Sequence, residues 1–186
     1  MMREKPRLYV LSSGGIDSTT LLHYYKSHSE NPTAIHFQYN QPSSISEKKA
    51  VEAISYYYKI KNHIYNIDFP IIQKKYEFYG RNALFVLATA SIVGAPSRIS
   101  LGIHSSTRYY DCSSSFITKM QEILDGYFAG TVQIETPFIN YSKKDIIDYA
   151  SKNKIPFHLT YSCLTKNAPP CGSCPSCKDR GKYLES

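Results

Sequence analysis

The segment LYVLSSGGIDSTT, residues 8–20, decides the fold that this sequence predicts. Its first four residues are apolar and typical of a buried strand, whereas Leu21, Leu22 and Tyr25 recur at helical spacing within residues 17–29. Two serines and two glycines form the turn between strand and helix, and their small side chains leave backbone N–H groups accessible. The segment therefore predicts an α/β fold with an anion site at its first strand–helix junction.

The anion best suited to this turn is the pyrophosphate of a nucleotide. Ser18 and Thr19 add hydroxyl donors in the first helical turn, where Asp17 can cap the helix or lie beside a Mg²⁺ that screens the phosphates. The spacing differs from the Walker loop, Gly-x-x-x-x-Gly-Lys-Ser/Thr, and from the Gly-x-Gly-x-x-Gly dinucleotide fingerprint. An ordinary glycine turn without a ligand is the alternative interpretation.

The composition is that of one folded domain. Its 186 residues are enough for a sizeable core, and 42% of them are hydrophobic. No apolar run approaches the ~20 residues that span a bilayer, and the N-terminus has no signal-peptide hydrophobic region, so we expect a cytoplasmic protein without a membrane segment. The net charge of +7 would attract nucleotides or nucleic acid, but the lysines are scattered, which favours a solvated basic surface over RNA binding.

Strand and helix patterns alternate along the chain. We expect strands at residues 7–12, 33–39, 63–67, 98–103 and 131–135, helices at 17–29, 45–58, 81–93, 116–128 and 142–152, and a loop at 69–80. Ser142 is the predicted N-cap of the last helix, with Asp145 at N3. Short connections between such units indicate a doubly wound parallel sheet of five strands, with the ligand beyond their carboxyl ends. Residues 1–157 are the expected nucleotide-binding domain and residues 158–186 a separate tail.

Four of the five cysteines are gathered in this tail. Cys163, Cys171, Cys174 and Cys177 follow the pattern Cys-x7-Cys-x2-Cys-x2-Cys. Four thiolates this close can hold one tetrahedral Zn²⁺, closed to water and therefore structural. An iron–sulfur cluster is the alternative, although the ferredoxin pattern needs one more cysteine after three further residues. We expect a zinc clip that folds the tail onto the sheet, and a packed, unliganded Cys112.

Further motifs accompany the turn and the cysteines. Residues 13–20, SGGIDSTT, resemble the Ser-Gly-Gly-x-Asp-Ser signature of the PP-loop ATP pyrophosphatases. Together with the four cysteines, they resemble the 7-cyano-7-deazaguanine synthases of queuosine biosynthesis. Residues 37–41, FQYNQ, resemble that family's Phe-x-Tyr-Gly-Gln, residues 80–82 its Pro-Gly-Arg-Asn, residues 110–112 its Pro-Asp-Cys-Arg, and Thr136-Pro137 with Lys143 its Thr-Pro-x5-Lys. The order and spacing of these motifs extend the resemblance over most of the chain.

The resemblance implies an adenine nucleotide alpha hydrolase-like fold and a two-stage reaction on 7-carboxy-7-deazaguanine. The carboxylate would receive AMP from ATP with loss of pyrophosphate, and ammonia would displace AMP to give the amide. A second ATP would activate the amide oxygen for nitrile formation. The implied cofactors are ATP with Mg²⁺ and a structural Zn²⁺, and the implied assembly is a homodimer.

The resemblance also implies roles for residues. Asp17, Ser18 and Lys143 are the expected catalytic residues, with Lys143 contacting the pyrophosphate. Asp111 would accept from the guanine-like N–H groups, with helix capping as its alternative role. The expected substrate-binding residues are Arg81, Asn82, Arg108 and Asp111. The expected ATP-binding residues are Leu11, Ser12, Ser13, Gly14, Gly15, Ile16, Asp17, Ser18, Thr19 and Phe37.

Four positions depart from the family pattern. Asn40, Ser43, Tyr79 and Ser113 stand where the family has Gly, His, Pro and Arg. Arg108, from the same loop, is our candidate to supply the positive charge of the arginine that Ser113 replaces. The stretch from residue 67 to residue 80 is much shorter than in the family, which predicts a more open pocket.

An open pocket widens the range of acceptors. Such a relative could couple the deazaguanine acid to a protein amine, as similar proteins in antiviral operons do. Two further interpretations stay open at this point, a tRNA-modifying PP-loop protein that transfers sulfur and a non-catalytic nucleotide sensor.

Overall fold

A five-stranded parallel sheet forms the centre of the computed structural model, which describes residues 5–68 and 78–184. The strands are β1 (Arg7–Leu11), β2 (Thr33–Gln38), β3 (Asn62–Asn66), β4 (Ser97–Ser100) and β5 (Val132–Glu135). Their order is β3-β2-β1-β4-β5, and Tyr9 of β1 lies opposite Thr33 and Ile99. The chain winds outward from β1 in both directions, so the predicted doubly wound sheet is confirmed. The loop predicted for residues 69–80 falls mostly outside the described residues.

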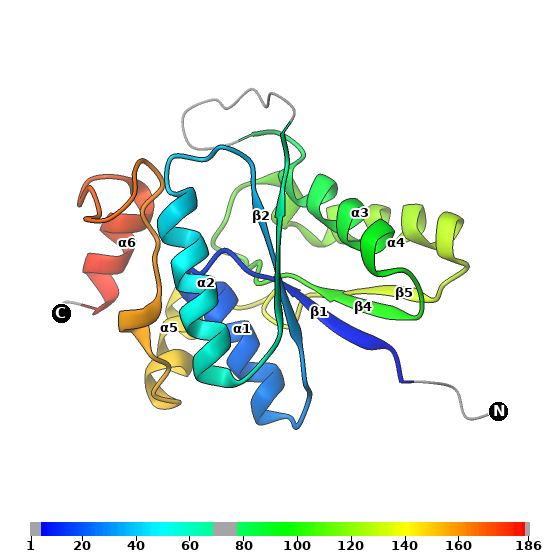
Figure 1. Ribbon diagram of the computed structural model, residues 1–186, viewed down its shortest axis with the longest axis horizontal. Coiled ribbons are helices and arrows are strands. Elements are labelled where there is room, and N and C mark those ends of the chain that lie inside the picture. Colours follow the sequence, from blue (N-terminus) through cyan, green and yellow to red (C-terminus); the bar gives the residue numbers. More distant parts are fainter. Residues whose placement is uncertain (1–4, 69–77, 185–186) are drawn as a thin grey trace.

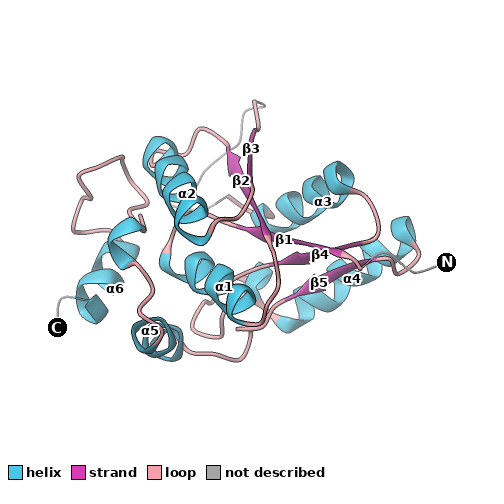
Figure 2. Cartoon of the chain, turned by 60° about the horizontal axis from the view of Figure 1, so that its bottom comes forward, coloured by secondary structure: helices cyan, strands magenta, loops and turns pink. Residues whose placement is uncertain are grey.

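Helices cover both faces of this sheet (Figure 1, Figure 2). They are α1 (Ile16–Ser27), α2 (Ser44–Tyr58) and α5 (Lys143–Lys152) on one face and α3 (Arg81–Val93) and α4 (Ser114–Phe128) on the other. Alternate residues of a strand point to opposite faces, so Leu8 and Val10 pack with α1 and α2, whereas Tyr9 and Leu11 pack with α3. Within the described residues, no helix combines the length and the apolar character needed to cross a membrane.

The fourth strand is shorter than the sequence pattern indicates. The prediction of strand structure over residues 98–103 is wrong for its last three residues, because β4 ends at Ser100. The N–H of Leu101 still donates to the carbonyl of Glu135 at 3.0 Å. The next residue, Gly102, lies so close to α1 that a Cβ there would be 3.2 Å from the carbonyl oxygen of Asp17. The chain therefore leaves the sheet at this point and passes across the start of α1.

Serine side chains cap two of the helices, one of them as predicted. Ser142 and Asp145 form the predicted capping box of α5, in which the N–H of Asp145 donates to Ser142 Oγ at 3.2 Å. In return, the N–H of Ser142 donates to Asp145 Oδ2 at 2.8 Å. Ser113 caps α4 by accepting from the N–H of Phe116. This cap starts α4 at Ser114, ahead of the start at residue 116 that periodicity predicts.

The tail contains a helix that periodicity does not predict, α6 (Pro175–Leu184). Proline is a common first residue of helices, because an N–H at that position would have no partner within the helix. Arg180 attaches α6 to the preceding segment by donating to the Thr160 hydroxyl at 2.7 Å and to the Phe157 carbonyl at 2.8 Å. Figure 1 shows α6 at one end of the molecule, beyond α2 and α5.

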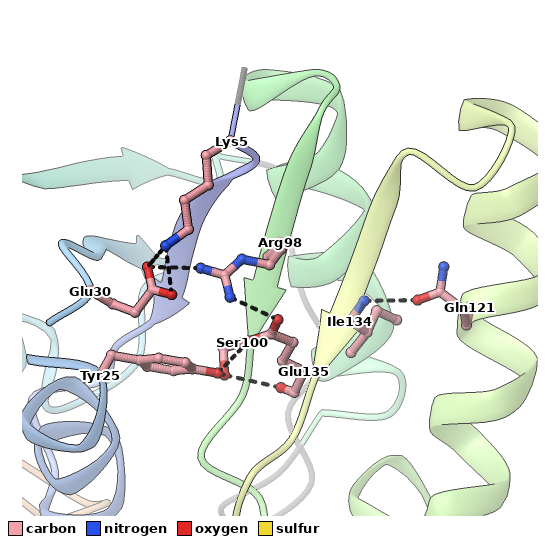
Figure 3. A network of polar contacts seen from close by, with 8 residues as sticks. All are labelled: Lys5, Tyr25, Glu30, Arg98, Ser100, Gln121, Ile134 and Glu135. Carbon is pink, nitrogen blue, oxygen red and sulfur yellow. Dashed lines mark hydrogen bonds and ion pairs between the residues drawn. The ribbon is translucent and has the colours of Figure 1, made fainter. Parts of the chain in front are cut away.

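A polar network connects α1 with the last two strands (Figure 3). The Tyr25 hydroxyl lies 2.8 Å from Ser100 Oγ and donates to Glu135 Oε2 at 2.7 Å. Burial raises the pKa of Tyr25 well above its ordinary value, so the hydroxyl keeps its proton and donates. Arg98 pairs with Glu135 at 3.2 Å and with Glu30 at 3.1 Å. The network fixes the C-terminal half of α1 across β4 and β5.

Candidate functional site

The turn of residues 12–15 packs against α2. Gly14 has a positive φ of 72°, and a Cβ at this position would lie 2.7 Å from Ala50 Cβ and 2.9 Å from the carbonyl oxygen of Glu47. The N–H of Ser12 donates to the Ile35 carbonyl of β2 at 2.8 Å, which fixes where the turn begins. Gly14 therefore sets the path of the turn, since the left-handed backbone and the contact with α2 both require glycine.

The hydroxyls around the turn differ in what they contact. The Gly15 carbonyl accepts from Thr19 Oγ1 at 2.7 Å and from Ser18 Oγ at 3.2 Å. Thr19 is fully buried, so its hydroxyl bonds the backbone at the start of α1 and does not face the cavity. Ser12 Oγ is buried without a hydrogen-bond partner in the described part of the chain, and Ser13 is exposed. Ser12 and Ser13 are therefore the hydroxyls best placed to meet a ligand.

A cavity of about 710 Å³ opens in front of the turn. Its wall comes from the carboxyl ends of β1 and β2, from the loop after β4, and from α5 and α6. The sequence-predicted residues that line it are Leu11, Ser12, Ser13, Gly15, Ile16, Asp17, Ser18, Phe37, Arg81, Asn82, Arg108 and Lys143. The predicted residues Gly14, Thr19 and Asp111 lie outside this lining.

An ion pair joins α1 and α5 in the cavity. Lys143 Nζ lies 2.5 Å from Asp17 Oδ1, and the N–H of Lys143 donates to Ser106 Oγ at 2.9 Å. His104 Nε2 lies 3.7 Å from the other carboxylate oxygen of Asp17. Burial opposes ionisation of Asp17, but His104 and Lys143 together outweigh it and hold the pKa of Asp17 below its ordinary value. The pair therefore presents a fixed ammonium group beside the turn.

The start of α3 forms a second polar region of the wall. Asp111 Oδ2 accepts from the N–H of Asn82 at 3.1 Å, and Asn82 Nδ2 donates to the Asp111 carbonyl at 2.9 Å. Asp111 thus caps α3, rather than the helix that follows it in the chain. Burial opposes the charge of Arg81, but the neighbouring Tyr39 and Asp111 side chains outweigh it and raise the pKa of Arg81. Arg108 is exposed at the rim.

The four cysteines of the tail form one cluster. Their sulfur atoms all lie within 4.8 Å of one another. Tetrahedral zinc with bonds of about 2.3 Å needs sulfurs about 3.8 Å apart, so this donor set fits zinc. The N–H groups of Cys171 and Cys174 donate to Cys163 Sγ at 3.4 Å and to Cys171 Sγ at 3.3 Å. The Thr165 hydroxyl and nearby N–H groups lower the pKa of Cys171 to about 5, which favours the thiolate that a metal binds.

The fifth cysteine, Cys112, is buried apart from this cluster, as its isolated position predicts. Burial raises the pKa of the Cys112 thiol to about 11.

Several wall residues carry no signal in the sequence. The N–H of Tyr161, just before the first tail cysteine, donates to the Gly14 carbonyl at 2.9 Å. Asp179, Arg180 and Tyr183 of α6 also line the cavity. Their positions depend on how the tail folds back on the turn, which no local pattern encodes. His104 could have been anticipated, because it follows β4 at the carboxyl edge where ligands bind in such sheets.

One family model, described as "Queuosine biosynthesis protein QueC", matches residues 7–79 and 71–186. The chain is also similar to a 7-cyano-7-deazaguanine synthase from Nautilia profundicola. The identity is 32% over 209 residues, which cover 95% of this chain and 92% of that protein.

Two solved structures share the fold at low sequence identity. A predicted subunit of tRNA methyltransferase from Methanocaldococcus jannaschii has a TM-score of 0.59 and 18% identity, covering 80% of this chain and 76% of its own. A 4-thiouridine synthetase–RNA complex with bound ATP has a TM-score of 0.58 and 16% identity, covering 97% of this chain and 50% of its own. At these identities the likeness concerns the PP-loop-type α/β fold alone.

Proposed function

The chain belongs to the QueC family, and from this we propose that it is an ATP-dependent 7-cyano-7-deazaguanine synthase that acts on 7-carboxy-7-deazaguanine. The observation that carries the proposal is the contact of Lys143 with Asp17, 126 residues apart, inside the cavity that the small-residue turn borders. A cation fixed beside backbone N–H groups suits the negative charge that grows on a departing pyrophosphate.

The first stage makes a carboxylate reactive. A carboxylate oxygen of the substrate attacks the α-phosphorus of ATP, and the bond from that phosphorus to the bridging oxygen breaks to release pyrophosphate. Lys143 and the N–H groups of residues 13–15 are the proposed groups that stabilise this leaving group, and Mg²⁺ bound with ATP would neutralise part of its charge. Ammonia then attacks the carbonyl carbon, loses a proton and displaces AMP, which gives the amide.

The second stage removes the amide oxygen. That oxygen attacks a second ATP, and pyrophosphate leaves as before. The amide nitrogen loses two protons in total as the carbon–oxygen bond breaks, AMP departs and the nitrile forms. Because the leaving groups are the same in both stages, the same residues can serve both.

The substrate end of the cavity is proposed to lie by the start of α3 and the loop after β4. Arg81, Asn82 and Arg108 line this part and are the proposed substrate-binding residues. Asp111 would act through Asn82, because its side chain and its carbonyl both bind that residue. The four cysteines are the proposed ligands of a structural zinc.

Incubation with ATP, Mg²⁺ and 7-carboxy-7-deazaguanine, with and without ammonia, tests this function. Mass spectrometry should detect AMP and pyrophosphate, and the amide and nitrile only when ammonia is present. AMP without amide or nitrile would contradict ammonia as the acceptor and favour a protein amine. No AMP under any of these conditions would contradict the enzymatic proposal as a whole.

A further inference from the structure

His104 faces the Asp17–Lys143 pair from the loop that follows β4. Its Nε2 lies 3.7 Å from Asp17 Oδ2, while Lys143 Nζ lies 2.5 Å from Asp17 Oδ1. The His104 side chain is 13% exposed and lines the cavity. One carboxylate therefore stands between an ammonium group and an imidazole, the side chain whose charge most readily changes near neutral pH.

The second ring nitrogen of His104, Nδ1, is buried and has no hydrogen-bond partner among the residues that the structure describes. In a neutral ring that carries its proton on Nε2, facing Asp17, the lone pair is on Nδ1. Among the residues that the structure describes, Asp17 of α1 pairs with the ring, and Lys143 of α5 lies across that carboxylate. The ring can therefore accept one more proton at Nδ1.

The charges of the cavity change when a triphosphate enters. With His104 neutral, the charges of Asp17 and Lys143 cancel. Lys143 is then paired with a carboxylate when the negatively charged phosphates arrive, which weakens its attraction for them. A further wall cation, Arg180, is engaged as well, since it donates to Thr160 and Phe157. Several negative phosphate charges in a low-dielectric cavity favour protonation of any nearby base.

We propose that His104 takes up a proton when a nucleoside triphosphate enters the cavity, so that the imidazolium holds Asp17 while Lys143 directs its charge to the phosphates. The proton comes from solvent and adds to the Nδ1 lone pair, while the N–H on Nε2 continues to face Asp17. His104 is thus a positioning residue for Asp17 and Lys143. The inference rests on the proposed nucleotide site.

Calorimetric titration with α,β-methylene-ATP and Mg²⁺ at pH 7, in buffers of small and large ionisation enthalpy, measures proton uptake on binding. The full-length, metal-loaded wild type should take up more protons than His104→Gln, by up to about one per nucleotide. Glutamine keeps an N–H that can face Asp17 but cannot gain a charge. His28→Gln is the matched control, because His28 lies at the far end of α1 against the Tyr24 carbonyl, and it should behave as the wild type.

The dependence of affinity on pH is the second readout. Wild-type affinity should weaken by about tenfold between pH 6 and pH 8 relative to His104→Gln. Equal proton uptake by both proteins would overturn the inference and leave the nucleotide site standing, because binding heat is still observed. If His104→Gln does not fold, a wild-type affinity independent of pH overturns the inference by itself. Absence of binding heat in the wild type would overturn the proposed nucleotide site, and the inference with it.

Discussion

Single residues of the turn serve different purposes although they are adjacent in sequence. Gly14 contacts α2, where a Cβ would lie 2.7 Å from Ala50 Cβ, and it does not line the cavity. Ser12 leaves a buried hydroxyl without a partner in the described chain, whereas Thr19 gives its hydroxyl to the Gly15 carbonyl. A motif that matches at every position thus contains both residues that shape the turn and residues that can meet a ligand.

Gly14→Ala should destabilise the protein by about 1–3 kcal/mol, because the added methyl group overlaps α2 and the backbone has a positive φ. Chemical denaturation measures the free energy of unfolding. The matched control is Gly126→Ala in α4, where a Cβ meets nothing within 4 Å and alanine should stabilise the helix by about 0.5–1 kcal/mol. Equal effects at both positions would contradict the packing role of Gly14.

Lys143→Gln should lower kcat/KM for AMP formation by about 10²–10³, since it removes the cation fixed beside the turn. The next residue offers a control, because Lys144 is exposed and pairs with Asp148 at 2.5 Å on the helix surface. Lys144→Gln should keep the wild-type rate. Steady-state kinetics with ATP and the deazaguanine acid compares the two, and a similar rate for both variants would contradict the role proposed for Lys143.

At the scale of elements, polar contacts fix how α1 crosses the sheet. The Tyr25 hydroxyl reaches Ser100 on β4 and Glu135 on β5, and Arg98 joins Glu135 to Glu30 (Figure 3). The cavity at the other end of α1 depends on this placement, because Asp17 in the first turn of that helix must meet Lys143 of α5. The network therefore supports the site from a distance.

Tyr25→Phe should destabilise the protein by about 1–2 kcal/mol, because Ser100 and Glu135 lose a buried hydrogen-bond partner. Thermal and chemical unfolding measure this change. Tyr56→Phe serves as the control, since the Tyr56 side chain is 88% exposed and its hydroxyl should matter by less than about 0.5 kcal/mol. A loss at position 25 no larger than that of the control would show that the network does not stabilise α1.

At the scale of the whole molecule, the tail completes the cavity. Tyr161 donates to the Gly14 carbonyl of the turn, and α6 forms part of the wall. Asn167 Oδ1 accepts from the N–H of Ser46 at 2.9 Å, and the N–H of Ala168 donates to Ser46 Oγ at 2.8 Å, at the start of α2. The cysteine cluster lies in the same segment, so we expect that loss of its structure would also disturb the turn.

Removal of the proposed zinc by a chelator should unfold α6 and weaken binding of α,β-methylene-ATP by at least about fivefold. Elemental analysis should find zinc in the purified protein, and far-UV circular dichroism and calorimetry should follow the loss of helix and of affinity together. Cys174→Ser should reproduce the loss, and Cys112→Ser should retain the metal, because Cys112 lies apart from the cluster. Unchanged affinity after complete metal removal would contradict the coupling.

The sequence by itself determined the order of the five strands and of helices α1 to α5, the turn at the first junction, the capping box of α5 and the grouping of the four cysteines. Each of these depends on residues that are near one another in the chain, where periodicity, cap chemistry and ligand spacing act. Tertiary structure alone decided that Asp111 caps α3, that His104 faces Asp17 and that α6 closes one wall. These features arise because the sheet order brings distant segments to one edge, and a local pattern holds no information about which distant segment packs against it.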